Sequence, residues 1–431
     1  MPNLTLKSVR RVEGRVTLPG SKSLSNRALL LASLAAGTTC ISNLLVSDDV
    51  ERMREALEAL GVALDVSEDA TRATVTGHAG RIQTEERVHR LYLGNAGTAF
   101  RPLTAALCLS RGIFELEGEP RMHERPIEHL VTALRDLGAR IEYTGREGYP
   151  PLRITGGDLD GGMISIPGNI SSQFLTSILM TAPLARAPIE IHVIGEQVSK
   201  PYIEITLDAK RRFDVEVAHR DLQQFQVPTG SYTSPGDFLV EGDASSATYF
   251  LAAGAIKGGP VRVRGVGSES VQGDVAFTKV LEAMGAQIDM GKDWIEVRGP
   301  EGKLKPFDMD LNAIPDAAMT AAATALFADG TSIIRNVYNL RVKETDRIQA
   351  LAQELRKLGA EVDAGNDYLK ITAPDRLKPA IIDTYDDHRM AMSLSLAALG
   401  DVDIEMRDPQ CVTKTFPEYF DAFESICVRS S

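Results

Sequence analysis

The sequence is poor in cysteine and in aromatic residues. Its 431 residues include one tryptophan and four cysteines, at positions 40, 108, 411 and 427. The spacing of these cysteines matches neither a zinc site nor the disulfide framework of a small secreted domain. We therefore expect Cys40, Cys108, Cys411 and Cys427 to be free thiols in a reducing compartment.

Long hydrophobic runs and an excess of positive charge are also missing. The first residues, MPNLTLKSVRRVEG, contain no apolar signal core, and no run approaches the roughly 20 apolar residues of a membrane-spanning helix. The net charge of −12 argues against nucleic acid or a membrane surface as the main partner. We expect a cytoplasmic monomer that acts on small molecules.

The motifs of common cofactor sites are incomplete. Ser21 separates Gly20 from Lys22, which breaks the nucleotide-binding P-loop pattern. Ile127 stands where a zinc peptidase helix beginning at His123 would need a second histidine. The sequence predicts neither a metal nor a nucleotide cofactor.

What the chain does contain is a repeat. Six segments pass from small polar residues into about a dozen mostly apolar ones, at intervals of 72–75 residues. They begin near Lys22, Gly97, Ser171, Ala244, Asp316 and His388. Because each segment is apolar on nearly all sides, we expect six buried helices whose positive N-terminal ends favour anions.

A second marker has the same period. Glycines at 61, 138, 285 and 359 lie between an amphipathic helix and a short strand, and Phe213 stands where the missing copy is expected. The strand near residues 4–18 is a candidate to complete the truncated sixth copy, FESICV. This predicts an α/β (α+β) fold of six βαβαββ-type repeats in two similar three-repeat domains with a cleft between them.

Several helix starts carry the groups that an anion site needs. Lys22, Ser23 and Arg27 combine cations with a hydroxyl, and Gly97 allows close approach to the main chain. We place Pro102 in the first turn of its helix. The segments RVKETDR (341–347) and DDHR (386–389) add charge at strand–helix junctions, with Lys343 and Arg347 one turn apart if their segment is helical. Simple helix capping and solvated charge are the alternative readings.

Together these segments closely resemble the 5-enolpyruvylshikimate-3-phosphate (EPSP) synthase family. The strings that carry the resemblance are GSKSLSNR, LGNAGTAFRP, SSQFLTSILM, VSKPYIEIT, IPDAAMT, NLRVKETDR, DDHRMAMS and KTFP. The resemblance implies the inverse α/β-barrel type of fold, with one domain of residues 1–21 plus 242–431, a second of 22–241, and hinges near 20–22 and 240–243.

The resemblance also implies an activity and its residues. The enolpyruvyl group of phosphoenolpyruvate would pass to the 5-hydroxyl of shikimate 3-phosphate, and glyphosate would compete with phosphoenolpyruvate. Shikimate 3-phosphate would bind Lys22, Ser23, Arg27, Ser171, Ser172, Gln173, Ser199, Tyr202, Asp316, Asn339 and Lys343. Phosphoenolpyruvate would bind Lys22, Gly97, Arg125, Gln173, Arg347, Arg389 and Lys414. The catalytic candidates are Asp316 as base, Glu344 as proton donor and then base, and Lys22.

Two other functions need separating from this one. The related enolpyruvyl transferase for UDP-N-acetylglucosamine usually has a cysteine in a mobile loop, and the comparable stretch here, EGEPRMHERPI (117–127), has none. A non-catalytic anion-binding module with the same fold is the other alternative, because a fold alone does not prove a function.

Overall fold

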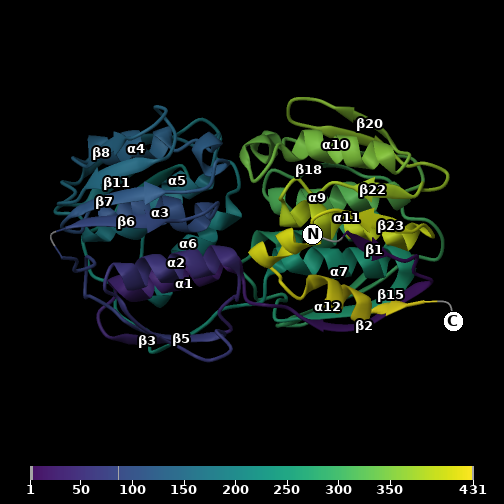
Figure 1. The fold of residues 1–431 in the computed structure, drawn as a ribbon, viewed down its shortest axis with the longest axis horizontal. Helices are drawn as coiled ribbons and strands as arrows, with labels where there is room; N and C mark the ends of the chain where they lie inside the picture. Colours follow the sequence, from purple (N-terminus) through teal and green to yellow (C-terminus); the bar gives the residue numbers. More distant parts are fainter. Residues whose placement is uncertain (1–2, 86, 430–431) are drawn as a thin grey trace. The chain divides into compact units, whose positions relative to one another are not determined.

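The computed structural model describes residues 3–85 and 87–429 (Figure 1). The chain forms two compact units: unit 1 is Met1–Pro19 with Glu241–Ser431, and unit 2 is Gly20–Val240. No helix among the described residues is long and apolar enough to cross a lipid bilayer.

Unit 2 contains three repeats, each with one four-stranded sheet. The first comprises β14 (Asp237–Leu239), α1 (Lys22–Leu34), β3 (Thr38–Ser42), α2 (Asp48–Ala59), β4 (Ala63–Val66) and β5 (Arg72–Thr76). The second comprises β6 (Val88–Tyr92), α3 (Gly97–Leu107), β7 (Ile113–Glu117), α4 (Glu128–Asp136), β8 (Arg140–Tyr143) and β9 (Leu152–Thr155). The third comprises β10 (Gly162–Pro167), α5 (Ser172–Thr181), β11 (Ile189–Ile194), α6 (Pro201–Arg212), β12 (Ala218–Arg220) and β13 (Gln224–Val227).

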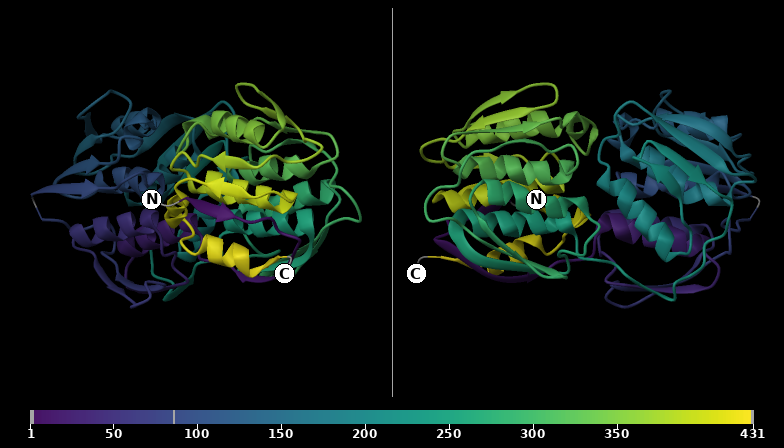
Figure 2. Two further views of the ribbon diagram at one scale, coloured as in Figure 1. Left: turned by 45° about the vertical axis from the view of Figure 1, so that its right-hand side comes forward. Right: turned by 180° about the vertical axis from the view of Figure 1, so that it is seen from behind.

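Unit 1 contains the other three repeats (Figure 2). The fourth comprises β2 (Arg11–Thr17), α7 (Ala244–Lys257), β15 (Gly258–Arg264), α8 (Phe277–Ala283), β16 (Gln287–Met290) and β17 (Trp294–Arg298). The fifth comprises β18 (Asp308–Asp310), α9 (Pro315–Thr324), β19 (Thr331–Arg335), α10 (Arg347–Lys357), β20 (Glu361–Ala364) and β21 (Leu369–Thr372). The sixth comprises β22 (Ala380–Ile382), α11 (His388–Leu394), β23 (Ile404–Met406), α12 (Tyr419–Ser425) and β24 (Cys427–Val428), with β1 (Leu4–Leu6).

The strand pairing confirms the predicted repeat. In the second repeat β6 and β7 are parallel, while β9 is antiparallel to both β7 and β8. The same order recurs in the third and fifth repeats. The prediction that the N-terminal segment completes the sixth repeat is confirmed for β1, which pairs with β23. Strand β2 instead pairs along most of its length with β15 of the fourth repeat and pairs with β24 only at Arg11 and Val12. The fold is a mixed α/β repeat of several small sheets.

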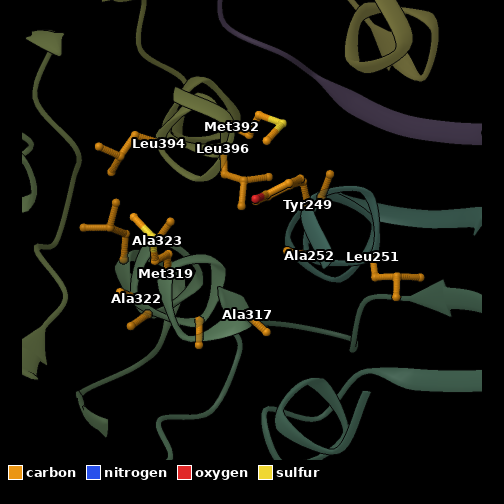
Figure 3. Packing of buried hydrophobic residues seen from close by; sticks show 14 of the residues in the cluster. Tyr249, Leu251, Ala252, Ala317, Met319, Ala322, Ala323, Met392, Leu394 and Leu396 are labelled. Atoms are coloured by element: carbon orange, nitrogen blue, oxygen red, sulfur yellow. The ribbon is translucent and has the colours of Figure 1, made fainter. Parts of the chain in front are cut away.

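The six buried helices begin where the sequence predicts. Helices α1, α3, α7 and α11 start at the predicted residue, whereas α5 and α9 start one residue away. Neighbouring buried helices are joined by hydrogen bonds between residues 72 positions apart, at Asn26–Thr98, Arg101–Gln173 and Thr248–Thr320. In unit 1 the buried side chains of α7, α9 and α11 belong to one hydrophobic core, part of which Figure 3 shows. Residues one repeat length apart therefore occupy equivalent positions on neighbouring buried helices and lie side by side.

Three local predictions need correction. Pro102 lies inside α3, five residues after its first residue, so it does not mark the first turn. The left-handed residue of the third repeat is Asp214, with φ of 64°, and not Phe213, which corresponds to the helix C-cap. The Asp214 amide donates to the Arg211 carbonyl, and the Val215 amide donates to the Lys210 carbonyl. The first repeat ends α2 with the same two bonds, in which Gly61 stands in the place of Asp214. The residues before α10 are not helical, so Lys343 and Arg347 do not share a helix face.

An unusual buried lysine joins two helices of unit 2. Lys210 of α6 is fully buried, and its ammonium group donates a hydrogen bond to the Leu179 carbonyl near the end of α5. That carbonyl has no helical donor of its own, because the residue four positions later is Pro183. Burial lowers the pKa of Lys210 to about 7.

The Lys210→Met variant should change how stability depends on pH. The folded wild type loses the lysine proton near pH 7 and the unfolded chain near 10.5, so folded wild type gains stability as pH rises between these values. The stability difference between wild type and variant should therefore shift by about 2 kcal/mol in favour of wild type from pH 7 to pH 9. Urea unfolding followed by circular dichroism measures this, with fluorescence of Trp294 in unit 1 as the internal control. A difference in the free energy of unfolding between wild type and variant that stays the same from pH 7 to pH 9 would contradict the prediction.

Candidate active site

Most predicted site residues of unit 2 lie at or near the starts of the buried helices and of α6, whereas Arg125 follows the 3₁₀ turn Met122–Glu124. Lys22 is the first residue of α1, and its ammonium group lies 3.2 Å from the Asp49 carboxylate, with both side chains buried. Ser21 precedes it at the N-cap, but its side chain makes no capping hydrogen bond. The charge of Lys22 is therefore balanced inside its own unit by a residue of α2.

Arg27 links α1 to α6. Its Nε donates to Thr206 Oγ1 (2.8 Å), Nη1 to the Ser23 carbonyl (2.9 Å) and Nη2 to the Tyr202 carbonyl (3.3 Å). Burial lowers the pKa of Arg27 to about 10, which still leaves it charged at neutral pH. Just before α6, Ser199 has φ of 55°, a conformation that only a constrained turn imposes on serine. The predicted residues Ser23, Arg27, Ser199 and Tyr202 are thus brought together.

A second group surrounds the start of α3. Arg125 donates from Nη1 to both the carbonyl and the side-chain oxygen of Asn95, at 2.9 and 2.8 Å. A Cβ added to Gly97 would lie 2.8 Å from the Arg125 guanidinium and 2.6 Å from that of Arg101. Only a glycine leaves both arginines room in these positions.

The third buried helix of unit 2 joins this group. Ser171 caps α5 through its hydroxyl, which accepts a hydrogen bond from the Gln173 amide (3.2 Å), and Ser172 is the first helical residue. Gln173 Oε1 accepts a hydrogen bond from Arg101 Nη1 (2.5 Å). The prediction that Ser171 caps its helix is therefore confirmed. The hydrogen bond from Arg101 fixes the orientation of the Gln173 side-chain amide.

In unit 1 three cations converge on Asp316, in the first turn of α9. Arg347 Nη1 and Arg389 Nη2 each lie 3.0 Å from its carboxylate, and Lys343 Nζ lies 3.6 Å away. Burial acts to raise the pKa of Asp316, yet the charges of Arg389, Lys343 and Arg347 hold it well below its usual range. Asp316 is therefore ionised at neutral pH.

Arg347 is the centre of this cluster. Its side chain is 1 % exposed and makes two hydrogen bonds to Asp387, at 2.7 and 3.1 Å, besides contacting Asp316 and Glu344, the latter at 2.9 Å. Burial alone would lower the pKa of Arg347, but the charges of Asp387, Glu344 and Asp316 raise it above its ordinary value. Arg347 is therefore a permanent cation whose charge is shared among three carboxylates.

The remaining predicted residues of unit 1 lie on short irregular segments. Asn339 is buried in the 3₁₀ turn Tyr338–Val342, which leads to Lys343, and Lys414 ends the 3₁₀ turn Pro409–Lys414. Arg389 follows two left-handed residues, Tyr385 and Asp386, and it also donates to the hydroxyl of Tyr249 (3.1 Å). Among residues 3–85 and 87–429, no cluster of three or more His, Cys, Asp and Glu is able to hold a metal ion.

Sequence reasoning missed several partners of these groups. Asn95 and Arg101 lie within a string already singled out, and Asp387 lies within another, so a role for each was within reach. Asp49 gave no such signal, because an acidic residue in the first turn of an amphipathic helix is ordinary. The sequence therefore predicts the charged residues of the site but does not show which distant residues pair with them.

Solved structures share this architecture. The EPSP synthase of Acinetobacter baumannii superimposes with a TM-score of 0.81 at 25% identity, covering 99% of each chain. The enolpyruvyl transferase NikO of Streptomyces tendae superimposes with a TM-score of 0.79 at 18% identity, covering 98% of this chain and 97% of its own. The fold is that of the enolpyruvyl transferases.

Sequence relatives narrow the class. The model of the EPSP synthase (3-phosphoshikimate 1-carboxyvinyltransferase) family matches residues 6–423. The 3-phosphoshikimate 1-carboxyvinyltransferases of Vibrio vulnificus and Sulfurovum sp. are each 58% identical over 427 residues, covering 99% of this chain and 99% of their own. The chain belongs to the EPSP synthase family.

Proposed function

We propose that the chain transfers the enolpyruvyl group of phosphoenolpyruvate to the 5-hydroxyl of shikimate 3-phosphate, a step of the shikimate pathway that releases phosphate. The observation that carries the proposal is the convergence of Lys343, Arg347 and Arg389 on Asp316 at the start of a buried helix. Such a cluster combines a carboxylate able to accept a proton with cations able to hold phosphate and carboxylate groups.

The two substrates would use overlapping sets of residues, which share Lys22 and Gln173. We propose that shikimate 3-phosphate binds Ser23, Arg27, Ser171, Ser172, Gln173, Ser199, Tyr202, Asp316, Asn339 and Lys343, together with Lys22. The two fixed arginine–backbone bonds of Arg27 support this set, because they hold its guanidinium beside two of the listed residues. Hydroxyl and amide donors suit a phosphate and a polyol.

Phosphoenolpyruvate would bind the more strongly cationic set. We propose that its ligands are Lys22, Gly97, Arg125, Gln173, Arg347, Arg389 and Lys414. The guanidinium of Arg125, which lies beside Gly97 at the positive N-terminal end of α3, supports this assignment. An anion that binds Arg389 would draw its charge away from Asp316, which would increase the affinity of Asp316 for a proton.

The proton transfers then follow in two stages. In the addition, Asp316 accepts the proton of the 5-hydroxyl as that oxygen attacks the enol carbon. Glu344, which must first take up a proton from solvent because it is an ionised partner of Arg347 in this structure, gives that proton to the methylene carbon, which yields a tetrahedral intermediate. In the elimination, Glu344 takes a proton back from the new methyl group, the double bond re-forms, and phosphate leaves. We propose that Lys22, whose charge Asp49 balances in this structure, holds the leaving phosphate or protonates it.

The direct test is phosphate release. Purified protein with phosphoenolpyruvate should release phosphate when shikimate 3-phosphate is the acceptor and should not do so with UDP-N-acetylglucosamine. Release only with the second acceptor would assign the chain to the related transferase. No release with either acceptor would favour a non-catalytic anion-binding module.

The Gly97→Ala variant should resist glyphosate. The added methyl would lie 2.6–2.8 Å from the guanidinium groups of Arg101 and Arg125, so both side chains have to shift within the proposed phosphoenolpyruvate set. We expect the inhibition constant for glyphosate to rise at least tenfold, about 1.4 kcal/mol, with a smaller rise in the KM for phosphoenolpyruvate. Steady-state inhibition at low phosphoenolpyruvate measures both constants. Strong inhibition of the variant, or none of the parent, would contradict the prediction.

We further propose that the protein is a cytoplasmic monomer with hinges near residues 20–22 and 240–243. The four free cysteines support a reducing compartment. The hinge positions rest on the passage of the chain from one unit to the other at Pro19–Gly20 and Val240–Glu241. Light scattering after size-exclusion chromatography tests the first proposal, and hydrogen exchange at these residues with and without both substrates tests the second.

A further inference from the structure

The fourth buried helix, α7, is the one of the six that carries no predicted site residue. Its apolar run nevertheless includes Tyr249, whose side chain is fully buried. A tyrosine hydroxyl buried among apolar side chains normally has a hydrogen-bond partner, because it would otherwise lose its hydration without replacement. The partner of Tyr249 is Arg389, a residue of the proposed phosphoenolpyruvate set.

The guanidinium of Arg389 joins Tyr249 to Asp316. Its Nη1 donates a hydrogen bond to the Tyr249 hydroxyl (3.1 Å), and its Nη2 lies 3.0 Å from the Asp316 carboxylate. The two partners come from different helices, α7 and α9. Because a guanidinium is planar, contacts at two of its nitrogen atoms fix the direction in which it faces.

The ring of Tyr249 is itself held by an aromatic neighbour. It meets the ring of Tyr419 edge to face, with 5.6 Å between the centroids and 81° between the planes. The Tyr419 hydroxyl lies 2.7 Å from the hydroxyl of Ser395 and donates to the Met392 carbonyl (3.0 Å), so Tyr419 is fixed too. Figure 3 shows the Tyr249 side chain extending from α7 toward the helix of Met392.

Helix α7 is also fixed about its own axis. The hydroxyl of Thr248, the residue before Tyr249, lies 2.7 Å from that of Thr320 on α9. Consecutive residues of α7 are thus bonded to α9 and to α11. A rotation of α7 would break both bonds, so the Tyr249 hydroxyl meets Arg389 at a defined place.

The Tyr249 hydroxyl holds Arg389 without neutralising its charge. Burial raises the pKa of Tyr249 to about 12, although the charge of Arg389 acts in the opposite direction. The phenol is therefore neutral at neutral pH. A carboxylate in its place would form an ion pair with Arg389 and weaken the attraction of Arg389 for a substrate anion. A neutral oxygen orients the guanidinium and leaves its charge for other partners.

We propose that Tyr249 is a positioning residue for phosphoenolpyruvate: its hydroxyl orients the guanidinium of Arg389, which binds this substrate. The fourth repeat then contributes to the site through Arg389 and touches neither substrate. The inference rests on the proposed function, in which Arg389 belongs to the phosphoenolpyruvate set and not to the shikimate 3-phosphate set. Loss of the hydroxyl should therefore weaken the binding of one substrate and not of the other.

The first test is Tyr249→Phe, which keeps the ring and removes the hydroxyl. The KM for phosphoenolpyruvate, measured by phosphate release, should rise at least about fivefold, the usual loss when a hydrogen bond to a buried charged group is removed. The kcat should stay within about twofold of wild type, because the lost interaction supports ground state and transition state alike. The Kd of shikimate 3-phosphate alone, measured by calorimetry, should not change.

The matched control is Tyr419→Phe. It removes a second buried hydroxyl from the same aromatic group, one that bonds to Ser395 and Met392. Both variants should lose some stability in urea unfolding followed by the fluorescence of Trp294, but only Tyr249→Phe should raise the KM for phosphoenolpyruvate. Equal KM values in the two variants would overturn the proposal.

The second test is a double-mutant cycle with Arg389→Lys, which keeps the charge and removes the guanidinium plane. If Tyr249 acts through Arg389, adding Tyr249→Phe to this variant should raise the KM for phosphoenolpyruvate by less than about twofold. A rise as large as in the wild-type background would overturn the proposal, because the hydroxyl would then act without the guanidinium.

The outcomes separate the inference from the proposed function. If the wild type releases phosphate but Tyr249→Phe keeps the wild-type KM for phosphoenolpyruvate, the positioning role fails and the proposed function stands. A fall of kcat without a rise of KM, or an equal weakening of both substrates, also overturns the role, because it indicates a merely structural residue. If the wild type releases no phosphate, the proposed function fails and the inference falls with it.

Discussion

Replacing Asp316 by asparagine is expected to lower kcat by on the order of 10²–10⁴-fold, the usual contribution of a general base. The amide has nearly the same shape, but it cannot accept the proton of the 5-hydroxyl. In the wild type Lys343, Arg347 and Arg389 each lie within 3.6 Å of the Asp316 carboxylate. In the variant the same three cations face a neutral amide. Rapid-quench measurement of the tetrahedral intermediate should show slow formation in this variant.

Glu344→Gln gives the complementary result. Without an acid at this position the methylene carbon is not protonated, so both formation and breakdown of the intermediate should slow. Glu361→Gln, at an exposed position of β20, is the matched control and should react as wild type does. Normal formation and breakdown of the intermediate in both Asp316 and Glu344 variants would contradict the proton-transfer scheme.

Arg347→Met should be the most destabilising of the single substitutions considered. It removes the cation that contacts Asp387, Asp316 and Glu344 at 2.7–3.1 Å and leaves their negative charges buried. Breaking a buried ion cluster from one side costs about 3–5 kcal/mol. Urea unfolding followed by the fluorescence of Trp294, in the same unit, measures the loss.

The control for this variant is another arginine–aspartate pair of unit 1. Arg335 also makes two bonds to a single carboxylate, Asp308, but both side chains are about half exposed. Water solvates the charges that Arg335→Met leaves behind, so its effect on stability should be far smaller. Equal losses in the two variants would show that burial does not decide the cost here.

The repeat could be predicted because it follows from packing. A helix that is buried on all sides shows an apolar run whatever its partners are, and its small polar start repeats with the unit. The predicted starts at Lys22, Gly97, Ala244 and His388 are those of the structure for this reason. The left-handed position after α6 was misplaced by one residue, because Asp214 adopts the conformation that glycine marks elsewhere.

Charge partners could not be predicted in the same way. From its residues alone the RVKETDR segment is either a helix face or a solvated charge run, and only the family resemblance assigns Lys343 and Arg347 to a site with Asp316. In the structure an irregular turn directs both side chains to Asp316, some thirty residues earlier. Asp49 is an ordinary acidic residue in the sequence, and only the folded chain shows that it is buried beside Lys22, a proposed site residue. A carboxylate has the same local pattern whether its neighbour is water or an arginine.

The exchange of strands between the ends of the chain sets an order of synthesis and folding. Strand β14, which completes the first repeat, is the last strand of unit 2, so that unit has all its strands once residue 239 has left the ribosome. Strands β1 and β2 are made first, yet their partners β15, β23 and β24 begin only at residues 258, 404 and 427. During synthesis β1 and β2 therefore have no native partner until the strands of unit 1 are made, after unit 2 is complete.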